Sequence, residues 1–400
     1  MGLKFSSIEG QSKGYYAALG VLVLLSLLGS SGFMISYIEG HRVLGSNNLM
    51  PWGMTLVVAI YLIGLSAGSL ILSSLTYVFG KEAYRPISRI AVYLALVLIF
   101  GAMIAIVLDL GRPEKSWRLF MFFVLNNMRS LFAINGILYG GYFAISLVYL
   151  GLIFAERQKY YRWAAMVAMV WAALVHMGTG AIFGFVAARP IFYSPLKPFE
   201  FLAAAMVSGL ALLIIVVVFL FKFTHRPFDR GVISSLGSLL VPLIIGLFAI
   251  VFIDKLTHLY PSDREPVLWL MTGPFSWIFW VFQVGCAYVL PLLILIHPRF
   301  RKSIHGIVVA AFLIVIGIFG ERFVLVIPGA AYPLPVYPGQ IEGVWGKVGI
   351  FHLTLTDSLI SVGLFGLMGL LFLLGLRYLE LMPFHEAEEP KPAQESPASS

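Results

Sequence analysis

The stretch RIAVYLALVLIFGAMIAIVLDLGRP, residues 89–113, is the part of the sequence that decides the fold. Between Arg89 and Asp109 every residue is apolar, a glycine or a tyrosine. That run has about the length that a helix needs to cross the hydrocarbon core of a bilayer. Gly111 allows a tight exit from such a helix, and Pro113 cannot continue it. The stretch therefore predicts a membrane-spanning helix that ends in a charged loop at a membrane surface.

The whole chain has the composition of an integral membrane protein. Of its 400 residues, 60% are hydrophobic and 12% are charged, whereas soluble domains carry about 25% charged residues. The mean hydropathy is +0.93. The sequence predicts an all-α membrane protein with about ten spanning helices, at approximately residues 14–38, 52–79, 88–109, 130–154, 161–187, 199–221, 232–254, 267–296, 305–327 and 354–379.

These helices are expected to form one polytopic membrane domain, residues 1–382. Within it, residues 52–187 form a first four-helix bundle and residues 199–327 a second, with one further helix at each end. Residues 383–400, rich in Pro, Ser and Glu, are expected to form a disordered cytoplasmic tail. A faint similarity between the two bundles would make Asp109 and Asp254 equivalent positions.

Charge in the loops predicts the orientation. With ten helices both termini lie on one side, and more than half of the 27 Lys and Arg residues fall on that side. The positive-inside rule therefore places both termini in the cytoplasm, in a multi-pass protein of the cytoplasmic (inner) membrane. The opposite loops are longer and rich in Pro, Gly and aromatic residues, so function is expected at the outer face.

Cysteine and histidine usage limits the cofactors. The single cysteine, Cys286, cannot supply the four thiolates of an iron–sulfur cluster. A bis-histidine haem needs two histidines at matched depth, and only His176 is expected deep within a helix, so no haem is predicted. No histidine or cysteine spacing indicates a metal site. The net charge of +8 is not taken as an indication of nucleic-acid binding.

His176 is the first candidate for chemistry. No charged residue stands between Arg162 and Arg189 on either side of it. Ionisable residues at membrane depth are costly, and an imidazole exchanges protons near neutral pH. Hydrogen bonding to a quinone or quinol oxygen would use those properties. The alternative is a histidine that only links two helices.

Asp109 is the second candidate, at the outer end of its helix. An acid beside a histidine would accept its proton or orient its ring. The alternative is a local pairing of Asp109 with Arg112, three residues further on.

Further polar residues are expected near the outer ends of helices. Glu39 and His41 follow the first helix, and Trp52 begins the second with an interfacial aromatic ring. The remaining residues of this kind are Asp254, His258, Glu321, Arg322, His352 and Asp357. Glu321 and Arg322 are interpreted as a buried ion pair that fixes helix packing or as part of a proton route.

Several motifs, in this order, resemble the NrfD/polysulfide reductase membrane-subunit family. They are GSNNLMPWGM (45–54), YLIGLSAGS (61–69), LDLGRP (108–113), HMGTGAIFGFVAARPIFYSPLKPFEFLAAAMVSGLAL (176–212) and ERFVLVIPGAAYPLP (321–335). The ten-helix length is similar to the longer branch of the family, which includes DsrP, HybB and the quinol-oxidising subunits of alternative complex III.

The resemblance implies a site for menaquinone or ubiquinone in the first bundle, near the outer face, and no redox cofactor in this chain. It also implies a periplasmic, ferredoxin-like iron–sulfur partner, in a complex that can include cytochrome c or catalytic subunits. His176 and Asp109 are the best matches to the polar site residues of the family, followed by Arg112 and Trp52. Asn135 stands where relatives place an acid, which puts a proton route through that helix in doubt.

The sequence thus predicts a quinone-interacting subunit of an oxidoreductase complex, with quinol oxidation as the preferred direction and proton release or translocation left open. Two alternatives stay open, a secondary transporter and a purely structural membrane anchor. The charges concentrate near the outer edge and leave the membrane midplane almost bare, which favours the redox interpretation over a transporter.

Overall fold

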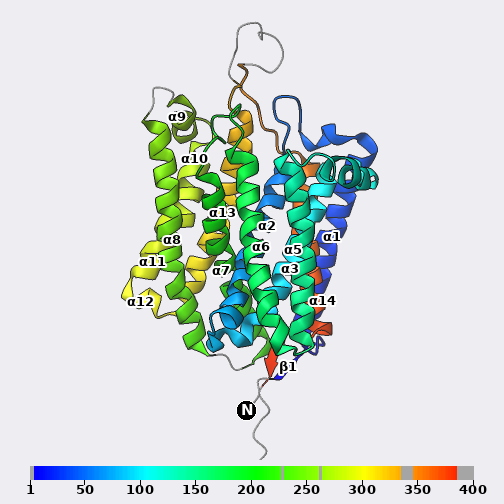
Figure 1. Cartoon of the computed structure of the whole chain (residues 1–400), viewed down its shortest axis with the longest axis vertical. Helices are drawn as coiled ribbons and strands as arrows, with labels where there is room; N and C mark the ends of the chain where they lie inside the picture. The colour runs from blue at the N-terminus through cyan, green and yellow to red at the C-terminus, as the bar shows by residue number, and fades with distance from the viewer. Residues whose placement is uncertain (1–3, 227–228, 261–263, 335–345, 385–400) are drawn as a thin grey trace, which may run out of the picture.

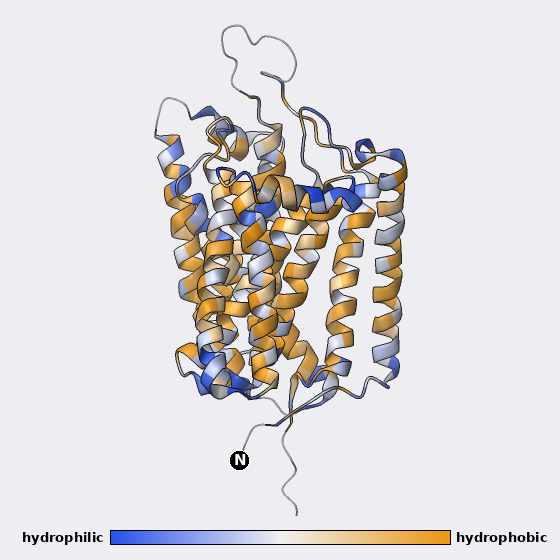
Figure 2. Cartoon of the chain, turned by 45° about the vertical axis from the view of Figure 1, so that its right-hand side comes forward, coloured by the Kyte–Doolittle hydropathy of each residue, from blue (hydrophilic) through white to orange (hydrophobic). Residues whose placement is uncertain are grey.

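The computed structural model describes residues 4–226, 229–260, 264–334 and 346–384. Ten helices in these ranges are long and apolar enough to cross a membrane, which confirms the predicted all-α membrane fold. The helices stand side by side in one upright bundle (Figure 1). Hydrophobic residues fill the middle of the bundle and hydrophilic residues gather at its two ends (Figure 2), as a bilayer requires.

Nine of the spanning segments are single α-helices. They are α1 (Lys13–Glu39), α2 (Met54–Val78), α3 (Arg85–Asp109), α5 (Leu131–Phe154), α6 (Gln158–Gly184), α7 (Lys197–Thr224), α8 (Arg230–Leu259), α13 (Ile304–Ala331) and α14 (Leu355–Tyr378).

The segment predicted at 267–296 is divided. α9 (Glu265–Thr272) ends before Gly273, and the membrane span then runs through α10 (Ser276–Ile278), the π-helix η5 (Phe279–Val289) and α11 (Leu290–Ile296). Pro274 lies in the break, where its missing N–H and its ring interrupt the helix.

Short elements lie at both ends of the bundle. One end carries the strands β1 (Lys4–Ser6) and β2 (Met382–Phe384), which pair antiparallel. We call it the strand end, and the opposite end the loop end. β2 extends past the predicted start of the tail at residue 383, and residues 385–400 of that tail lie outside the described residues. The other short elements are η1 (His41–Leu44), η2 (Glu82–Tyr84), η3 (Pro113–Lys115), α4 (Ser116–Arg118), the π-helix η4 (Leu119–Val124) and α12 (Pro298–Arg301).

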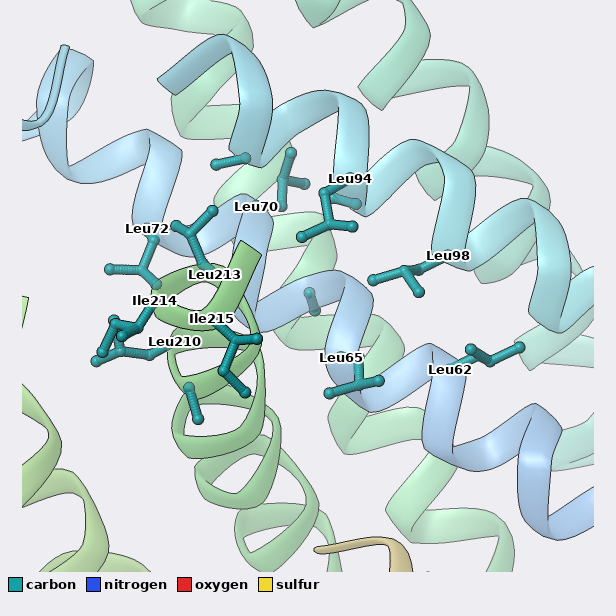
Figure 3. Close-up of a cluster of buried hydrophobic side chains, with 14 of the residues drawn as sticks. Leu62, Leu65, Leu70, Leu72, Leu94, Leu98, Leu210, Leu213, Ile214 and Ile215 are labelled. Carbon is teal, nitrogen blue, oxygen red and sulfur yellow. The ribbon is translucent and has the colours of Figure 1, made fainter. Parts of the chain in front are cut away.

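α2 is the central helix of the bundle. In its most apolar window 89% of the residues are buried, compared with 11% in α1. α2 packs against α3, α6 and α7, and leucine and isoleucine side chains of α2, α3 and α7 interdigitate in the core (Figure 3). Gly68 of α2 meets Gly209 of α7 so closely that a Cβ on either residue would overlap the other helix. Lipid is as apolar as leucine, so such close approach stabilises helix pairs in a membrane.

Two groups of helices and one peripheral pair make up the bundle. α2, α3, α5 and α6 pack together, as do α7, α8, the η5–α11 segment and α13, and α7 joins the groups by packing on α2 and α6. α1 and α14, from opposite ends of the chain, pack against each other. Gly29 and Gly363 face each other in that pair without room for a side chain.

Candidate functional site

Two carboxylates and a histidine come together at the loop end. Asp109 is the last residue of α3, Asp357 lies in the first turn of α14, and His41 begins η1. The Asp357 carboxylate is close enough to act electrostatically on both other groups. We call these three residues the acid–histidine cluster. The sequence identifies Asp109 and His41 as candidates but indicates only that Asp357 lies near a helix end.

Asp357 is fully buried and caps a helix from a distant part of the chain. Its Oδ2 accepts a hydrogen bond from the Met54 N–H at 2.7 Å, and its Oδ1 accepts from the Thr55 N–H at 3.0 Å and from the Thr55 hydroxyl at 2.6 Å. Gly53, at the N-cap of α2, has no side chain to do this. A carboxylate is also favoured at the positive end of a helix dipole. The carboxylate of Asp357 thereby connects α14 to α2.

Asp109 has no such partners, because no described residue donates a hydrogen bond to its carboxylate. The chain leaves α3 through Gly111, whose φ of 71° favours glycine. The alternative interpretation, a pairing with Arg112, is not observed: Arg112 Nη1 lies 3.9 Å from Glu114 Oε1 instead, and both of these side chains are exposed. Asp109 is therefore a partly buried acid without a described hydrogen-bond partner at the loop end.

His41 presents a buried ring nitrogen to the same region. Its Nδ1 is buried and has no hydrogen-bond partner among the described residues. A Cβ at Gly111 would lie 3.3 Å from this atom, so the ring covers the exit turn of α3. Burial lowers the pKa of His41 below its ordinary value of 6.5, and the Asp357 carboxylate opposes that effect. The ring is consequently neutral at pH 7, with one buried nitrogen that no described residue satisfies.

An apolar cavity of about 190 Å³ lies between the helices that carry the cluster, and none of the three cluster residues lines it. Its lining includes Ile104 and Leu108 of α3, just before Asp109, and Ile360 of α14, three residues after Asp357. α1 contributes Gly29 and Phe33 to the lining. Small-molecule pockets commonly measure about 300–1,000 Å³, so this cavity suits one ring or a short length of hydrocarbon chain. It lies between α3 and the peripheral pair, whereas the sequence places the site among the helices of the first bundle.

Trp52, Glu39 and Arg112 do not join the cluster. The Trp52 ring lies 5.7 Å from Phe183 and 5.8 Å from Phe192, in an aromatic group at the loop end of α6. The Glu39 and Arg112 side chains are exposed. The structure thus brings together Asp109 and His41 from the predicted set, and it places these three residues elsewhere on the loop end.

His176 lies inside the bundle and links α6 to α2. It is 1% exposed, its Nδ1 lies 2.9 Å from the Ala172 carbonyl oxygen, and its Nε2 lies 2.9 Å from the Ile63 carbonyl oxygen. A neutral imidazole has one N–H and can donate to only one of them. α2 packs between α3 and α6, and no hydrogen bond or ion pair joins His176 to Asp109 in the described structure. Its predicted contact with a quinone oxygen stays a prediction.

Asn135 faces α6 close to His176. Its Nδ2 donates to the Leu131 carbonyl at 2.8 Å, while its Oδ1 is buried without a described partner and adjoins the backbone of Gly178. One turn along, the Tyr139 and Thr179 hydroxyls are hydrogen-bonded at 2.9 Å. Asn135 Oδ1 is therefore an acceptor without a described partner where α5 faces α6.

A second set of buried charges lies in the other group of helices. Lys197 Nζ is 2.6 Å from Glu200 Oε2 and 3.4 Å from Asp254 Oδ2. Asp254 also accepts hydrogen bonds from the Ser194 hydroxyl and from Lys255. Lys197 and Glu200 are not among the residues predicted from the sequence, although their i, i+3 spacing at a helix start is a detectable signal.

Glu321 and Arg322 lie deeper, beside this set. Arg322 Nη1 is 3.4 Å from Glu321 Oε1, and the guanidinium lies 4.0 Å from the centre of the Phe201 ring. The Tyr288 hydroxyl of η5 donates to Glu321 Oε2 at 3.1 Å. None of the three guanidinium nitrogens of Arg322 has a described hydrogen-bond partner. We call Lys197, Glu200, Asp254, Glu321 and Arg322 the buried charge network. With it, the membrane interior holds more charge than the sequence predicts.

Comparison with known proteins identifies the family. Residues 42–333 match the family described as Polysulphide reductase, NrfD. The chain belongs to the NrfD family. The match includes Asp109 and His176, while His41 lies one residue before it and Asp357 lies after it.

Relatives of this NrfD-family chain include membrane subunits of several complexes. The Hdr-like menaquinol oxidoreductase integral membrane subunit of Archaeoglobus fulgidus is 33% identical, over 97% of this chain and 99% of the relative. The menaquinone reductase integral membrane subunit of Nitratidesulfovibrio vulgaris is 24% identical, over 88% of this chain and 87% of the relative. The protein NrfD of Escherichia coli is 23% identical, over 70% of this chain and 95% of the relative.

Proposed function

We propose that this chain is the quinone-interacting membrane subunit of a respiratory redox complex. It exchanges electrons between the menaquinone or ubiquinone pool and an iron–sulfur partner subunit at the loop end, in the direction of quinol oxidation. The observation that carries the proposal is the acid–histidine cluster at the ends of α3 and α14, the two helices that also line an apolar cavity. The names of the Archaeoglobus and Nitratidesulfovibrio relatives, a menaquinol oxidoreductase and a menaquinone reductase subunit, support the choice of substrate.

The cluster supplies the proton chemistry of the proposal. Oxidation of a quinol to a quinone releases two protons and two electrons. The neutral His41 accepts a proton from a quinol hydroxyl, and Asp109, partly exposed at the loop end, passes protons to the outer solvent. The apolar side chains of Ile104, Leu108 and Ile360 hold the ring or the first part of its hydrocarbon tail.

The electrons leave through another subunit in this proposal. Cys286 is the only cysteine, so an iron–sulfur cluster that receives the electrons belongs to a partner. The loop end carries the acid–histidine cluster and the longer connections, and it is the proposed docking face for a ferredoxin-like subunit, with cytochrome c or catalytic subunits as further members. The strand end then faces the cytoplasm in the inner membrane, as the positive-inside rule predicts.

His176 and Asn135 are further candidates for contact with the quinone headgroup. The free Oδ1 of Asn135 and the Nε2 of His176 are two polar atoms that a quinone headgroup would meet on entering the first bundle. Such an entry requires the His176 Nε2 to exchange the Ile63 carbonyl for a quinone oxygen.

The buried charge network favours a second activity linked to the first, the translocation of protons. Glu321 stands ten residues before the end of α13, or about 15 Å along the helix axis. Carboxylates at such depth are characteristic of proton relays. Proton movement through this network would accompany quinol oxidation at the acid–histidine cluster.

A cavity-filling substitution tests the site without altering a charge. Leu108→Trp places an indole in the cavity, whereas Leu110→Trp adds the same indole at an exposed position two residues further on. We expect L108W to weaken binding of a quinol analogue to the purified complex at least about tenfold, the scale of losing a few buried methylenes. L110W should bind as the wild type does. Equal binding by L108W and the wild type would refute the cavity as the quinone site.

A further inference from the structure

The strand end carries a groove between helices that belongs to neither the acid–histidine cluster nor the buried charge network. Two adjacent cavities, of about 450 Å³ and 530 Å³, share Arg230, Ile304 and His305 as lining residues. They lie where the end of α7 meets the beginnings of α8 and α13. We call them together the basic groove, because its lining includes Lys222, Arg226, Arg230, Lys302 and His305.

The charged side chains that line the basic groove are all basic. No Asp or Glu is among the described residues that line either cavity. Lys222, Arg230 and Lys302 are exposed and form no ion pair with any described residue, while Arg226 donates to the carbonyls of Ser7 and Pro383. Three cations that face one groove repel each other, so the groove favours an anionic occupant.

The N-terminus of α13 adds to this preference. α13 begins at Ile304 inside the groove, and Ser303 at its N-cap forms no side-chain hydrogen bond. The free N–H groups of the first turn carry the positive end of the helix dipole. An anion in the groove therefore meets amide donors as well as ammonium and guanidinium groups.

The other wall of the groove is apolar and faces the membrane. Val218, Phe219, Ile233 and Val308 are among the residues that line the first cavity. The Phe219 ring stacks on Phe223 at 5.9 Å, which extends the apolar surface along α7. A small soluble anion has no apolar part that could contact these side chains. A lipid can place its headgroup on the cations and its acyl chains against the apolar side chains.

We propose that the basic groove binds an anionic phospholipid, with its phosphodiester between Lys222, Arg230 and Lys302 and its acyl chains along α7 and α13. The site lies in the leaflet at the strand end. The lipid fills the gap at which α7, α8 and α13 separate and so stabilises that end of the second group of helices. This inference is independent of the quinone chemistry at the loop end.

Native mass spectrometry of the full chain in detergent measures this binding. The probes are dioleoyl phosphatidylglycerol and, with the same chains but no net charge, dioleoyl phosphatidylcholine. We expect retention of phosphatidylglycerol in preference to phosphatidylcholine. Lys222→Gln and Lys302→Gln should each weaken phosphatidylglycerol binding about fivefold, and Lys222→Gln/Arg230→Gln about 25-fold, since each cation contributes about a factor of five at low ionic strength.

The matched control is Lys159→Gln/Arg162→Gln, which removes two exposed cations at the strand end of α6, outside the groove. It should retain phosphatidylglycerol as the wild type does. Equal retention of the two lipids, or equal losses in the control and groove variants, would overturn the proposal. Displacement of phosphatidylglycerol by inorganic phosphate at equal concentration would also overturn it, because the site would then recognise a free anion and not a lipid.

Discussion

At the scale of single residues, His41 combines features that residues of the loop end seldom share. One ring nitrogen is buried without a described partner, although buried polar atoms are nearly always hydrogen-bonded. It stands over Gly111 at the exit of α3, two residues after Asp109 in the chain. A substrate hydroxyl would satisfy this nitrogen. The position of His41 therefore fits a proton acceptor better than a solvated loop residue.

The lowered pKa of His41 predicts the pH dependence of quinol oxidation. A base works in its neutral form, and burial moves the protonation of His41 below pH 6.5. The rate should stay high through pH 7 and fall only as the pH drops through the folded pKa. We expect His41→Gln to remove this acid limb and to lower the rate at pH 7 about 100-fold. An unchanged pH profile in H41Q would contradict this role, with Arg42→Gln as the neighbouring control.

His176 is a different kind of histidine, because both of its ring nitrogens already contact backbone carbonyls. His176→Ala leaves a cavity between α2 and α6 and removes those contacts. It should destabilise the protein by about 2–4 kcal/mol, measured as thermal unfolding in detergent. If His176 also contacts the quinone, the same variant loses affinity for a quinol analogue. Unaltered analogue binding would exclude that contact.

At the scale of elements, the N-terminus of α2 is held by a carboxylate from the other end of the chain. Asp357 satisfies the Met54 and Thr55 amides and the Thr55 hydroxyl. This capping positions α14, and with it one wall of the cavity, against the central helix.

Removing the Asp357 carboxylate should lower the stability of the protein more than removing one of the hydrogen bonds that it accepts. Thr55→Val deletes only the hydroxyl contact, and we expect a loss of about 1 kcal/mol. Asp357→Ala leaves buried N–H donors without a partner, and we expect a loss of about 2–4 kcal/mol. Thermal unfolding of the two variants, followed by tryptophan fluorescence, measures the difference. Equal melting temperatures of the Asp357→Ala variant and the wild type would show that the Asp357 carboxylate does not stabilise the start of α2.

At the scale of the whole molecule, hydrophobic runs were enough to predict the spanning helices. The apolar run ends at Leu108, one residue before the last residue of α3. Charge, Gly111 and Pro113 all favour the end of the helix at this place. The break at Pro274 was missed, because the residues on both sides are apolar. Hydropathy alone does not separate an interfacial helix such as α9 from the span that follows.

The site was only partly predictable, since its members come from distant segments. Asp109 and His41 were found individually, as an ionisable residue at a helix end and a loop histidine. Their approach to Asp357 depends on the pairing of α1 with α14, which is set by glycine contacts such as Gly29 with Gly363. Small residues occur throughout membrane helices, so one sequence does not indicate which of them meet.

The buried charge network predicts a separable effect on proton movement. In proteoliposomes with the assembled complex, Glu321→Gln should lower the number of protons translocated per quinol while quinol oxidation continues. Glu265→Gln, an exposed acid of α9, is the control and should change neither quantity. Proton translocation by E321Q at the wild-type ratio would contradict a route through Glu321.

The most direct test of the central claim is the rate of quinol oxidation by the assembled complex with Asp109→Asn. This substitution keeps the shape of the side chain but removes its ability to accept a proton, and Glu39→Gln makes the same change at an exposed acid of the same end. We predict a turnover about 100-fold lower in D109N and wild-type turnover in E39Q. Wild-type turnover and quinol affinity in D109N would contradict the proposed role of the acid–histidine cluster.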